Sequence, residues 1–309
     1  MAGPGGQVHK GWRRHMRWAR ESSWGNLPPA PDWHCIPIRS GVMTLKARAN
    51  LFDPSTSFTN WRRNVLLPEL QEVAGQIEVL AWPEVTGYLL DAALERDANH
   101  DLQSYCVDYF TPPDPRRCLG VVVERLRIRA DRESVALLLE ARAWKEQEND
   151  VLAEDDFDYS ALTPTPFRLR DAAITLDGSG LTDVGEFAIV VDNAVEAGPR
   201  SAGGYVAFLI AGLRSVSLEV AKLDNADDFN AAIRSGATMS FAAGFTHPEG
   251  HEMTLELPRL HVERSDEDGL PSRVARSRAV LQATTDESDV DLAYQVNLAG
   301  QTTTTTAAS

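Results

Sequence analysis

The chain of 309 residues contains an internal repeat, and this repeat limits the folds that it can adopt. Without a gap, residues 77–79 (Ile-Glu-Val) match residues 218–220 (Leu-Glu-Val), which lie 141 positions downstream, and Tyr88 matches Phe229. In both copies, an apolar strand-like segment precedes a short helix-like segment. A chain with two copies of one unit offers two equivalent edges and is suited to closing a ring from few subunits.

Alternating apolar and polar residues predict β-strands in both copies. In the first copy, Leu126 and Ile128 alternate with arginines, and a second alternating run begins at Val135, which is typical of a hairpin with one half-buried face. In the second copy, residues 186–192 and 290–298 show strand patterns. We therefore expect a mainly β chain of two tandem β-sandwich or barrel modules, each with a short flanking α-helix.

Proline and glycine predict where several of these elements begin and end. Pro83 precedes a helix expected over residues 84–95, and Gly236 is placed to end the corresponding helix of the second copy. A strand that contains Leu255 and Leu257 is expected to stop at Pro258, because proline cannot donate a hydrogen bond to a sheet.

Composition along the chain divides it into five segments. The beginning combines glycine, proline, arginine and tryptophan without an apolar period, which favours an extended arm. Residues 145–158 contain seven acids and one lysine, and their repulsion is expected to keep the connection between the modules extended. The predicted segments are the arm at 1–34, module 1 at 35–148, an acidic linker at 149–165, module 2 at 166–300 and a flexible tail at 301–309.

The overall composition excludes several classes of protein. No apolar run exceeds residues 205–213, so we expect no membrane-spanning segment, and no apolar stretch of a secretory signal follows the first arginines. The three cysteines form no C-x-x-C pair and are odd in number, which indicates a reducing cytoplasm. A formal charge of −15 disfavours tight nucleic-acid binding, although an acidic wall would suit a channel through which DNA slides.

No pattern of residues indicates catalysis or a cofactor. His247 and His251 have the spacing that binds zinc on a helix, but Pro248 and Gly250 favour a hairpin turn there. The sequence contains no phosphate-binding loop, dinucleotide glycine pattern or nucleophile elbow. We therefore expect no enzyme activity, no metal and no cofactor.

Basic and aromatic residues of the arm indicate a surface for a partner. As a nucleic-acid contact, the arm would stack bases and neutralise phosphates. As an assembly arm, it would pair with the acidic body of a neighbouring subunit, and we favour this alternative because the rest of the chain supplies the opposite charge. The candidate contact residues are Trp12, Arg13, Arg14, Arg17, Trp18 and Trp24.

The order of segments resembles the tail tube proteins of long-tailed bacteriophages. Three stretches carry the resemblance best: Ala-Arg-Glu-Ser-Ser-Trp-Gly at 19–25 leading to Ile-Pro-Ile at 36–38, Gly-Gln-Ile-Glu-Val at 75–79 leading through Gly-Tyr-Leu-Leu at 87–90, and Phe-Ala-Ile-Val-Val-Asp-Asn at 187–193. The segments 217–233 and 255–259 are similar as well. The resemblance covers most of residues 19–265, and residues 270–298 add two strands outside it.

The resemblance implies a two-sheet β module with a flanking helix, whose strands join those of neighbouring subunits in a continuous β-barrel around a lumen. Rings of this family typically have six modules, so two modules in each chain imply a ring of three chains with pseudo-sixfold symmetry. A ring of six chains, with one module of each chain on the outside, is the alternative. The implied function is that of a major tail tube protein, whose stacked rings form a conduit that DNA passes without specific binding.

The resemblance also implies partners and a location. The chain would assemble with itself in the host cytoplasm, and in the virion tail it would meet the tape-measure, tail terminator and distal tail proteins. The long connections at residues 51–74 and 193–212 look like the parts that reach an adjacent ring, which adds the candidate contact residues Trp61, Leu66, Phe208 and Leu209. A monomeric β-sandwich that binds or adheres at the virion surface is the competing function.

Overall fold

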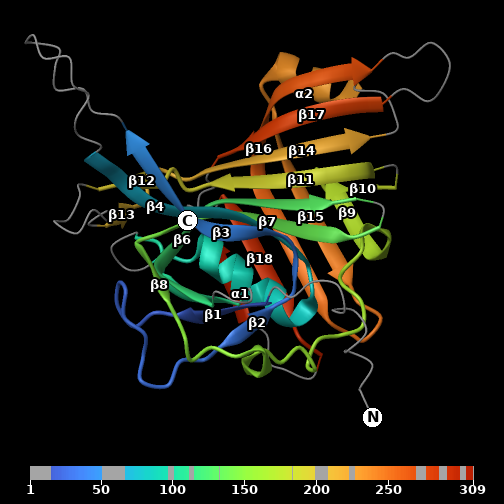
Figure 1. Ribbon diagram of the computed structural model, residues 1–309. Helices are drawn as coiled ribbons and strands as arrows, with labels where there is room; N and C mark the ends of the chain where they lie inside the picture. Colours follow the sequence, from blue (N-terminus) through green and yellow to red (C-terminus); the bar gives the residue numbers. More distant parts are fainter. Residues whose placement is uncertain are drawn as a thin grey trace, which may run out of the picture.

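The computed structural model describes residues 15–50, 67–96, 101–110, 115–131, 133–182, 184–198, 208–222, 227–268, 276–284, 291–299 and 304–308. These residues form a mainly β, antiparallel fold with two α-helices (Figure 1), so the predicted fold class is confirmed. Within these residues, neither helix has the length and apolar character that crossing a membrane requires.

Eight antiparallel strands form the main sheet, and in Figure 1 several of them lie one below another, from β17 near the top to β3. In spatial order the strands are β3 (Ile38–Asn50), β4 (Leu67–Leu80), β7 (Val135–Ala143), β6 (Arg116–Ala130), β11 (Val184–Asp192), β14 (Ser215–Lys222), β17 (Arg276–Ala283) and β16 (Glu252–Asp268). This sheet is not closed, because its end strands β3 and β16 do not pair with each other.

The main sheet consists of one four-strand pattern used twice. The order β3-β4-β7-β6 in the first half recurs as β11-β14-β17-β16 in the second. The register recurs as well: Ile77 pairs with Leu139 in the first half, and its counterpart Leu218 pairs with Leu281 in the second. The internal repeat in the sequence is therefore a repeat of the fold.

Each half carries a second layer of strands. The long strands β6 and β16 each pass from the main sheet into this layer, where β5 and β8 pair with β6, and β15 and β18 pair with β16. The strands of the two second layers are β1 (His15–Arg20), β2 (His34–Ile36), β5 (Tyr105–Phe110) and β8 (Lys145–Glu148) in the first half, and β9 (Ala172–Leu176), β10 (Ser179–Leu181), β15 (Thr238–Thr246), β18 (Leu292–Asn297) and β19 (Thr304–Ala308) in the second. A separate two-stranded sheet contains β12 (Glu196–Ala197) and β13 (Leu209–Ile210).

One continuous hydrophobic core fills the space between these layers and runs through both halves. Apolar and polar residues that alternate along the strands produce this core. In β6, Leu126 and Ile128 point inward, while the arginines that alternate with them point outward. The helix α1 (Pro83–Leu94) lies between the main sheet and the strands β1 and β2 in Figure 1, with Leu89 and Leu90 fully buried.

The helix α1 also connects the two halves. Tyr294 of β18 donates a hydrogen bond of 2.6 Å from its hydroxyl to Asp91 of α1, and Val296 of β18 lies beside Gly87. The second helix, α2 (Asp227–Ser235), packs on β16 and buries Phe229, the counterpart of Tyr88 in the repeat.

Part of the predicted arm and of the predicted linker is folded onto module 1. Within the arm, β1 pairs with β2 and β5, and Met16 and Trp18 are buried. Within the acidic linker, Leu152 and Phe157 are buried, and two short 3-10 helices, Glu154–Asp156 and Leu169–Asp171, lie in and just after it. Repulsion between the acids does not keep the linker away from the protein, because burial of Leu152 and Phe157 holds it there.

Several predicted boundaries are wrong. The connection expected over residues 51–74 ends earlier, because β4 begins at Leu67. Pro258 does not end β16, because it lies at an irregularity in the pairing of β15 with β16, where a missing N–H is tolerated. The two strands expected within residues 270–298 are confirmed, as β17 in the main sheet and β18 in the second layer. In the tail expected to be flexible, residues 304–308 form β19, which pairs with β18.

Candidate assembly surfaces

The two halves of the main sheet are joined edge to edge by β6 and β11. Residues 125–130 pair antiparallel with residues 187–192 at six consecutive positions. On the apolar side of this joint, Ile128 lies opposite Ile189, and both side chains are fully buried. On the polar side, Arg125 lies opposite Asp192, and Arg125 Nε donates a hydrogen bond of 3.1 Å to Asp192 Oδ2.

The two end strands of the main sheet, β3 and β16, correspond in the repeat to β11 and β6, the two strands that form this joint. In the first half β3 has the place that β11 has in the second, and β16 has the place that β6 has in the first. Among the described residues, β3 pairs with β4 alone, and residues 262–268 of β16 pair with β17 alone. Each end strand therefore has one edge whose backbone N–H and C=O groups pair with no other strand among the described residues.

The polar side of the main sheet, named the open face here, carries ion pairs rather than an excess of acid. The chain has a formal charge of −15, but each of six arginines on or beside this face has a carboxylate partner. The pairs are Arg39–Glu78, Arg125–Asp192, Arg125–Glu140, Arg127–Glu219, Arg129–Asp131, Arg142–Glu124 and Arg278–Glu186. Six arginines and seven carboxylates leave these residues with a formal charge of −1. The paired residues therefore contribute almost no net charge to this face.

Asp192 illustrates how these pairs hold their charges. Burial opposes its ionisation, but the hydrogen bonds from Arg125 and from the Ala194 N–H outweigh it, so that the pKa of Asp192 is lowered. The carboxylate consequently stays ionised, and remains a partner for Arg125, at every pH near neutrality.

Two candidate contact residues of the arm, Arg17 and Trp18, are used inside the chain. The fully buried carboxylate of Asp108 accepts hydrogen bonds from Arg17 Nε at 3.0 Å and from Arg117 Nε at 2.6 Å. The Arg17 guanidinium lies over the Trp33 ring, with Arg17 Cζ 4.4 Å from the ring centroid. Trp18 is buried against Tyr105. These contacts anchor β1 in the first half, and both side chains are largely buried within the chain.

Trp24 and Leu209, although 185 positions apart, pack on the same small hydrophobic cluster of Leu102, Val122 and Val195. Phe208 lies next to this cluster along the chain and is 41% exposed. Ile210 and Leu213 are also exposed, so residues 208–213 form an apolar patch on the surface. The other candidate contact residues, Trp12, Arg13, Arg14, Trp61 and Leu66, lie outside the described residues.

Glu21 is a structural residue that the sequence did not single out. Its buried carboxylate accepts hydrogen bonds from Ser104 Oγ at 2.7 Å, from the Gly25 N–H at 2.8 Å and from the Gly120 N–H at 2.9 Å. Burial raises the pKa of Glu21, although the three hydrogen bonds oppose this effect. The residue fixes the turn that follows β1, and only the tertiary contacts reveal this role.

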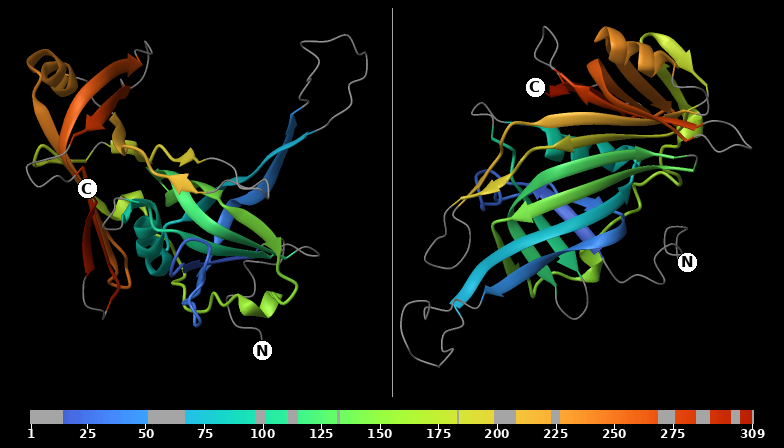
Figure 2. Two further views of the ribbon diagram at one scale, coloured as in Figure 1. Left: turned by 90° about the vertical axis from the view of Figure 1, so that its left-hand side faces the viewer. Right: turned by 90° about the horizontal axis from the view of Figure 1, so that it is seen from above.

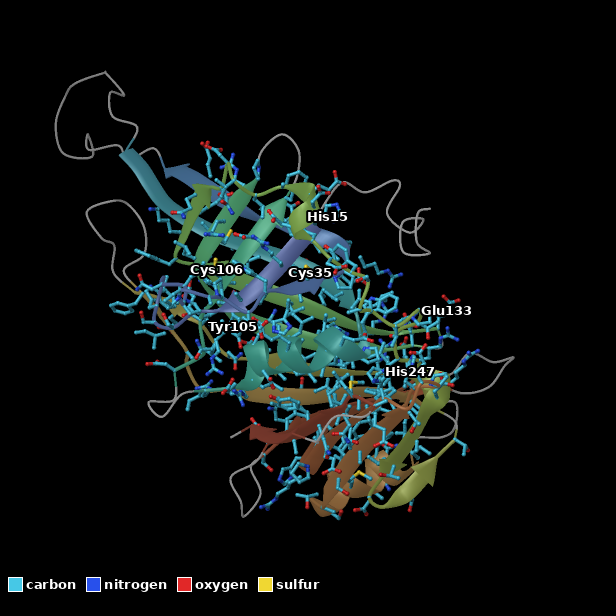
Figure 3. All side chains as sticks on the ribbon, turned by 90° about the horizontal axis from the view of Figure 1, so that it is seen from below. His15, Cys35, Tyr105, Cys106, Glu133 and His247 are labelled. Atoms are coloured by element: carbon cyan, nitrogen blue, oxygen red, sulfur yellow. The ribbon has the colours of Figure 1, made fainter. Side chains whose placement is uncertain are left out.

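The three cysteines are free thiols within module 1. Figure 3 labels Cys35 and Cys106, which lie in β2 and β5, and Cys118 lies in β6. Burial raises the pKa of all three thiols, that of Cys118 to about 12, so they stay protonated at neutral pH.

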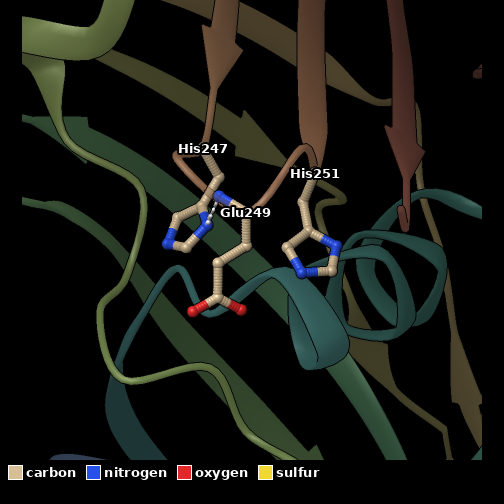
Figure 4. Close-up of side chains that lie close together, drawn as sticks. All are labelled: His247, Glu249 and His251. Carbon is tan, nitrogen blue, oxygen red and sulfur yellow. Dashed lines mark hydrogen bonds between the residues drawn. The ribbon is translucent and has the colours of Figure 1, made fainter. Parts of the chain in front are cut away.

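The hairpin turn predicted at residues 247–251 is confirmed, and both of its histidines make hydrogen bonds. Figure 4 shows the side chain of Glu249 between the rings of His247 and His251. His247 Nδ1 accepts a hydrogen bond of 3.2 Å from the Glu249 N–H, while Nε2 lies 3.0 Å from the Thr165 carbonyl oxygen. His251 Nδ1 accepts a hydrogen bond from the Ala299 N–H. A metal at His247 would have to break one of the two contacts of its ring, which favours a structural role for this residue in the turn between β15 and β16.

In the part of the chain that the structure describes, the main sheet has a polar face rich in ion pairs and two end strands that each pair on one side alone, and residues 208–213 form an exposed apolar patch. Free strand edges of this kind are typical of β proteins that assemble. A family model of phage tail tube proteins matches residues 11–255. The chain therefore belongs to the phage tail tube protein family, and it is a structural protein of the virion tail. None of the curated proteins that were compared with the chain matches it.

Proposed function

We propose that the chain is a major tail tube protein, without catalytic activity, whose rings stack into the hollow conduit for DNA delivery. Each ring contains three copies and therefore six modules. The observation that carries this proposal is the β6–β11 joint, in which one chain already makes the contact between two adjacent modules.

The same joint can form between chains. If β3 of one copy adds to residues 262–268 of β16 in the next copy, each interface of the ring repeats the internal joint. Such a contact is heterologous, and it closes only when the rotation from module to module divides a full turn. Three chains with eight strands each give a barrel without edges, which removes the exposed strand margins. Because both modules lie in one sheet, we favour this arrangement over six chains with an outer module.

The internal joint also predicts the register between chains. Ala188 of β11 pairs with Arg129 of β6. Ser40 takes the place of Ala188, since Ser40 pairs with Glu78 and Ala188 pairs with Glu219, the counterpart of Glu78. By the same comparison through β7 and β17, Asp266 takes the place of Arg129. Ser40 of one copy is therefore expected opposite Asp266 of the next.

Stacking of the rings uses the parts that project from this barrel. The strands β3 and β4 extend beyond the rest of the chain in both views of Figure 2. The apolar patch at residues 208–213 lies on the equivalent connection of the second half. We propose that both meet the adjacent ring, and that the tape-measure, tail terminator and distal tail proteins are the remaining partners of the tube.

Two introduced cysteines test the proposed contact between β3 of one copy and β16 of the next, and their cross-linking reveals the number of chains in a ring. The variant Ser40→Cys with Asp266→Cys should form a disulfide between copies after oxidation, because directly opposed residues have Cα atoms about 4.5–5.5 Å apart. In a closed ring of three, the cross-linked ladder on a non-reducing denaturing gel should stop at the trimer.

The matched control is Ser40→Cys with Arg264→Cys, which moves one cysteine by two positions and should cross-link poorly. A ladder that stops at the hexamer would identify a ring of six chains. Monomers alone, from a protein that negative-stain microscopy shows as isolated particles, would contradict the proposed function and favour the monomeric surface module.

A further inference from the structure

We propose that the carboxylates of the open face hold its arginines in ion pairs, so that DNA phosphates cannot recruit them and the face stays non-adhesive although it is rich in arginine. This inference rests on the proposed function, in which the open face lines the lumen. It concerns the affinity of that surface for double-stranded DNA, which is a polyanion.

The pairs connect different strands, so the register of the sheet fixes them. Arg125 of β6 contacts Asp192 of β11 and, at 3.6 Å, Glu140 of β7. Arg127 of β6 reaches Glu219 of β14 at 2.8 Å. Two neighbouring strands thus contribute to the surroundings of the Arg125 guanidinium, and a rearrangement that freed it would have to act on both.

The same design continues in the second half of the sheet. Arg278 of β17 donates a hydrogen bond of 3.0 Å to Glu186 of β11. The six pairs that join residues of two different strands therefore extend from β3 and β4 at one end to β17 towards the other.

Pairing changes what an arginine gains from a phosphate. A free guanidinium binds phosphate through two parallel hydrogen bonds and releases counterions from DNA, which is the main source of non-specific affinity. A paired guanidinium would only exchange one anion for another. Half-exposed ion pairs contribute little to stability, about 0–1 kcal/mol each, so their effect on DNA should be separable from their effect on the fold.

The test replaces the carboxylates and keeps the arginines. In the full-length chain, the variant Glu186→Gln with Asp192→Asn and Glu219→Gln is titrated against a short labelled DNA duplex, and fluorescence anisotropy is recorded at several salt concentrations. The wild type should show no saturable binding. The variant should bind, and its affinity should fall with salt, with a logarithmic slope of up to about 0.9 for each phosphate that a freed arginine neutralises.

The control removes the same number of charges outside the open face, at exposed Asp150→Asn, Asp155→Asn and Glu249→Gln. This control should behave as the wild type, and adding Arg127→Gln to the open-face variant should lower its salt slope. Equal binding by the two triple variants would assign the effect to net charge and overturn the inference. Absence of binding by the open-face variant would overturn it as well.

Circular dichroism verifies that each variant is folded, and the single change Glu219→Gln replaces the triple variant if the latter is not. Negative-stain microscopy of the wild type reads out the proposed function separately. Wild-type protein that forms no rings or tubes would contradict the proposed function, whereas tubes together with a non-binding open-face variant would contradict only the inference about DNA.

Discussion

The two halves of the main sheet follow one strand order, but they differ in their contacts among the described residues. The last strand and the helix of the first half both contact the second half, whereas the corresponding strand and helix of the second half have no third half to contact. In the first half, β6 is paired with β11, and the helix α1 touches β18 of the second half. In the second half, β16 corresponds to β6 and α2 corresponds to α1. Residues 262–268 of β16 pair only with β17 among the described residues, and Ile233 of α2 is 42% exposed.

The two halves therefore share one fold, and the second half differs because no further module follows it in the chain. The first half displays the contacts that a module makes when another module follows it. A second chain could supply the same contacts to β16 and α2. The following predictions test the comparison in order of their expected effect on the stability of a single chain.

Removal of the buried carboxylate of module 1 should have the largest effect. Asp108→Ala leaves Arg17 and Arg117 without their common acceptor. Breaking a buried ion pair by removing one partner costs about 3–5 kcal/mol. Denaturant unfolding measures the loss, with the exposed Asp155→Ala as a control that should change stability by less than about 0.5 kcal/mol. A similar, small effect of both substitutions would show that this cluster does not stabilise the first half.

Loss of the hydrogen bond between the halves should have an intermediate effect. Tyr294→Phe removes the donor to Asp91, and a hydrogen bond to a charged group contributes about 1.5–3 kcal/mol. Tyr88→Phe is the matched control, because the buried Tyr88 hydroxyl has no hydrogen-bond partner among the described residues, and its removal should not destabilise the protein. If Tyr88→Phe destabilised the chain as much as Tyr294→Phe, the contact between α1 and β18 would not be what matters.

A charge on the outer side of α2 should leave the single chain almost unchanged. Ile233→Asp replaces a side chain that is 42% exposed, so the free energy of unfolding should change by only about 0.5 kcal/mol. Ring formation, measured by sedimentation velocity and negative-stain microscopy, should fail, because a neighbouring module would bury the charge. Ile233→Leu keeps the apolar contact and should assemble. Normal rings from Ile233→Asp would exclude α2 from the contact between chains.

Local patterns predicted the elements of the fold better than their connections. The alternation around Leu126 and Ile128, and Pro83 at the start of α1, were sufficient to predict a hairpin and a helix start. The prediction that a strand ends at Pro258 is wrong, because whether a proline ends a strand depends on the pairing with its partner, and the pairing of β16 with β15 is irregular at that point. The burial of Trp18 against Tyr105 and the bond between Arg17 and the buried Asp108 could not be predicted, because the basic and aromatic segment shows no sign of these distant partners.

The candidate assembly surfaces were predictable only in part. The repeat indicated two equivalent edges, and the connection near residue 208 indicated an exposed apolar segment, of which Phe208 is part. The charge of the open face could not be predicted from a total of −15, because composition does not record on which side of a sheet a residue points. That side depends on the register, and a shift by one residue reverses it.

By itself, the sequence determined that the chain is a β protein made of two copies of one module, since periodicity and repetition are local properties that survive without any knowledge of the fold. Only the tertiary structure decided which edges are joined, which are left for another copy, and that arginine and carboxylate side chains distant in the chain neutralise one another. Those features arise from pairing between strands far apart in sequence, and no local pattern encodes the partner of a strand.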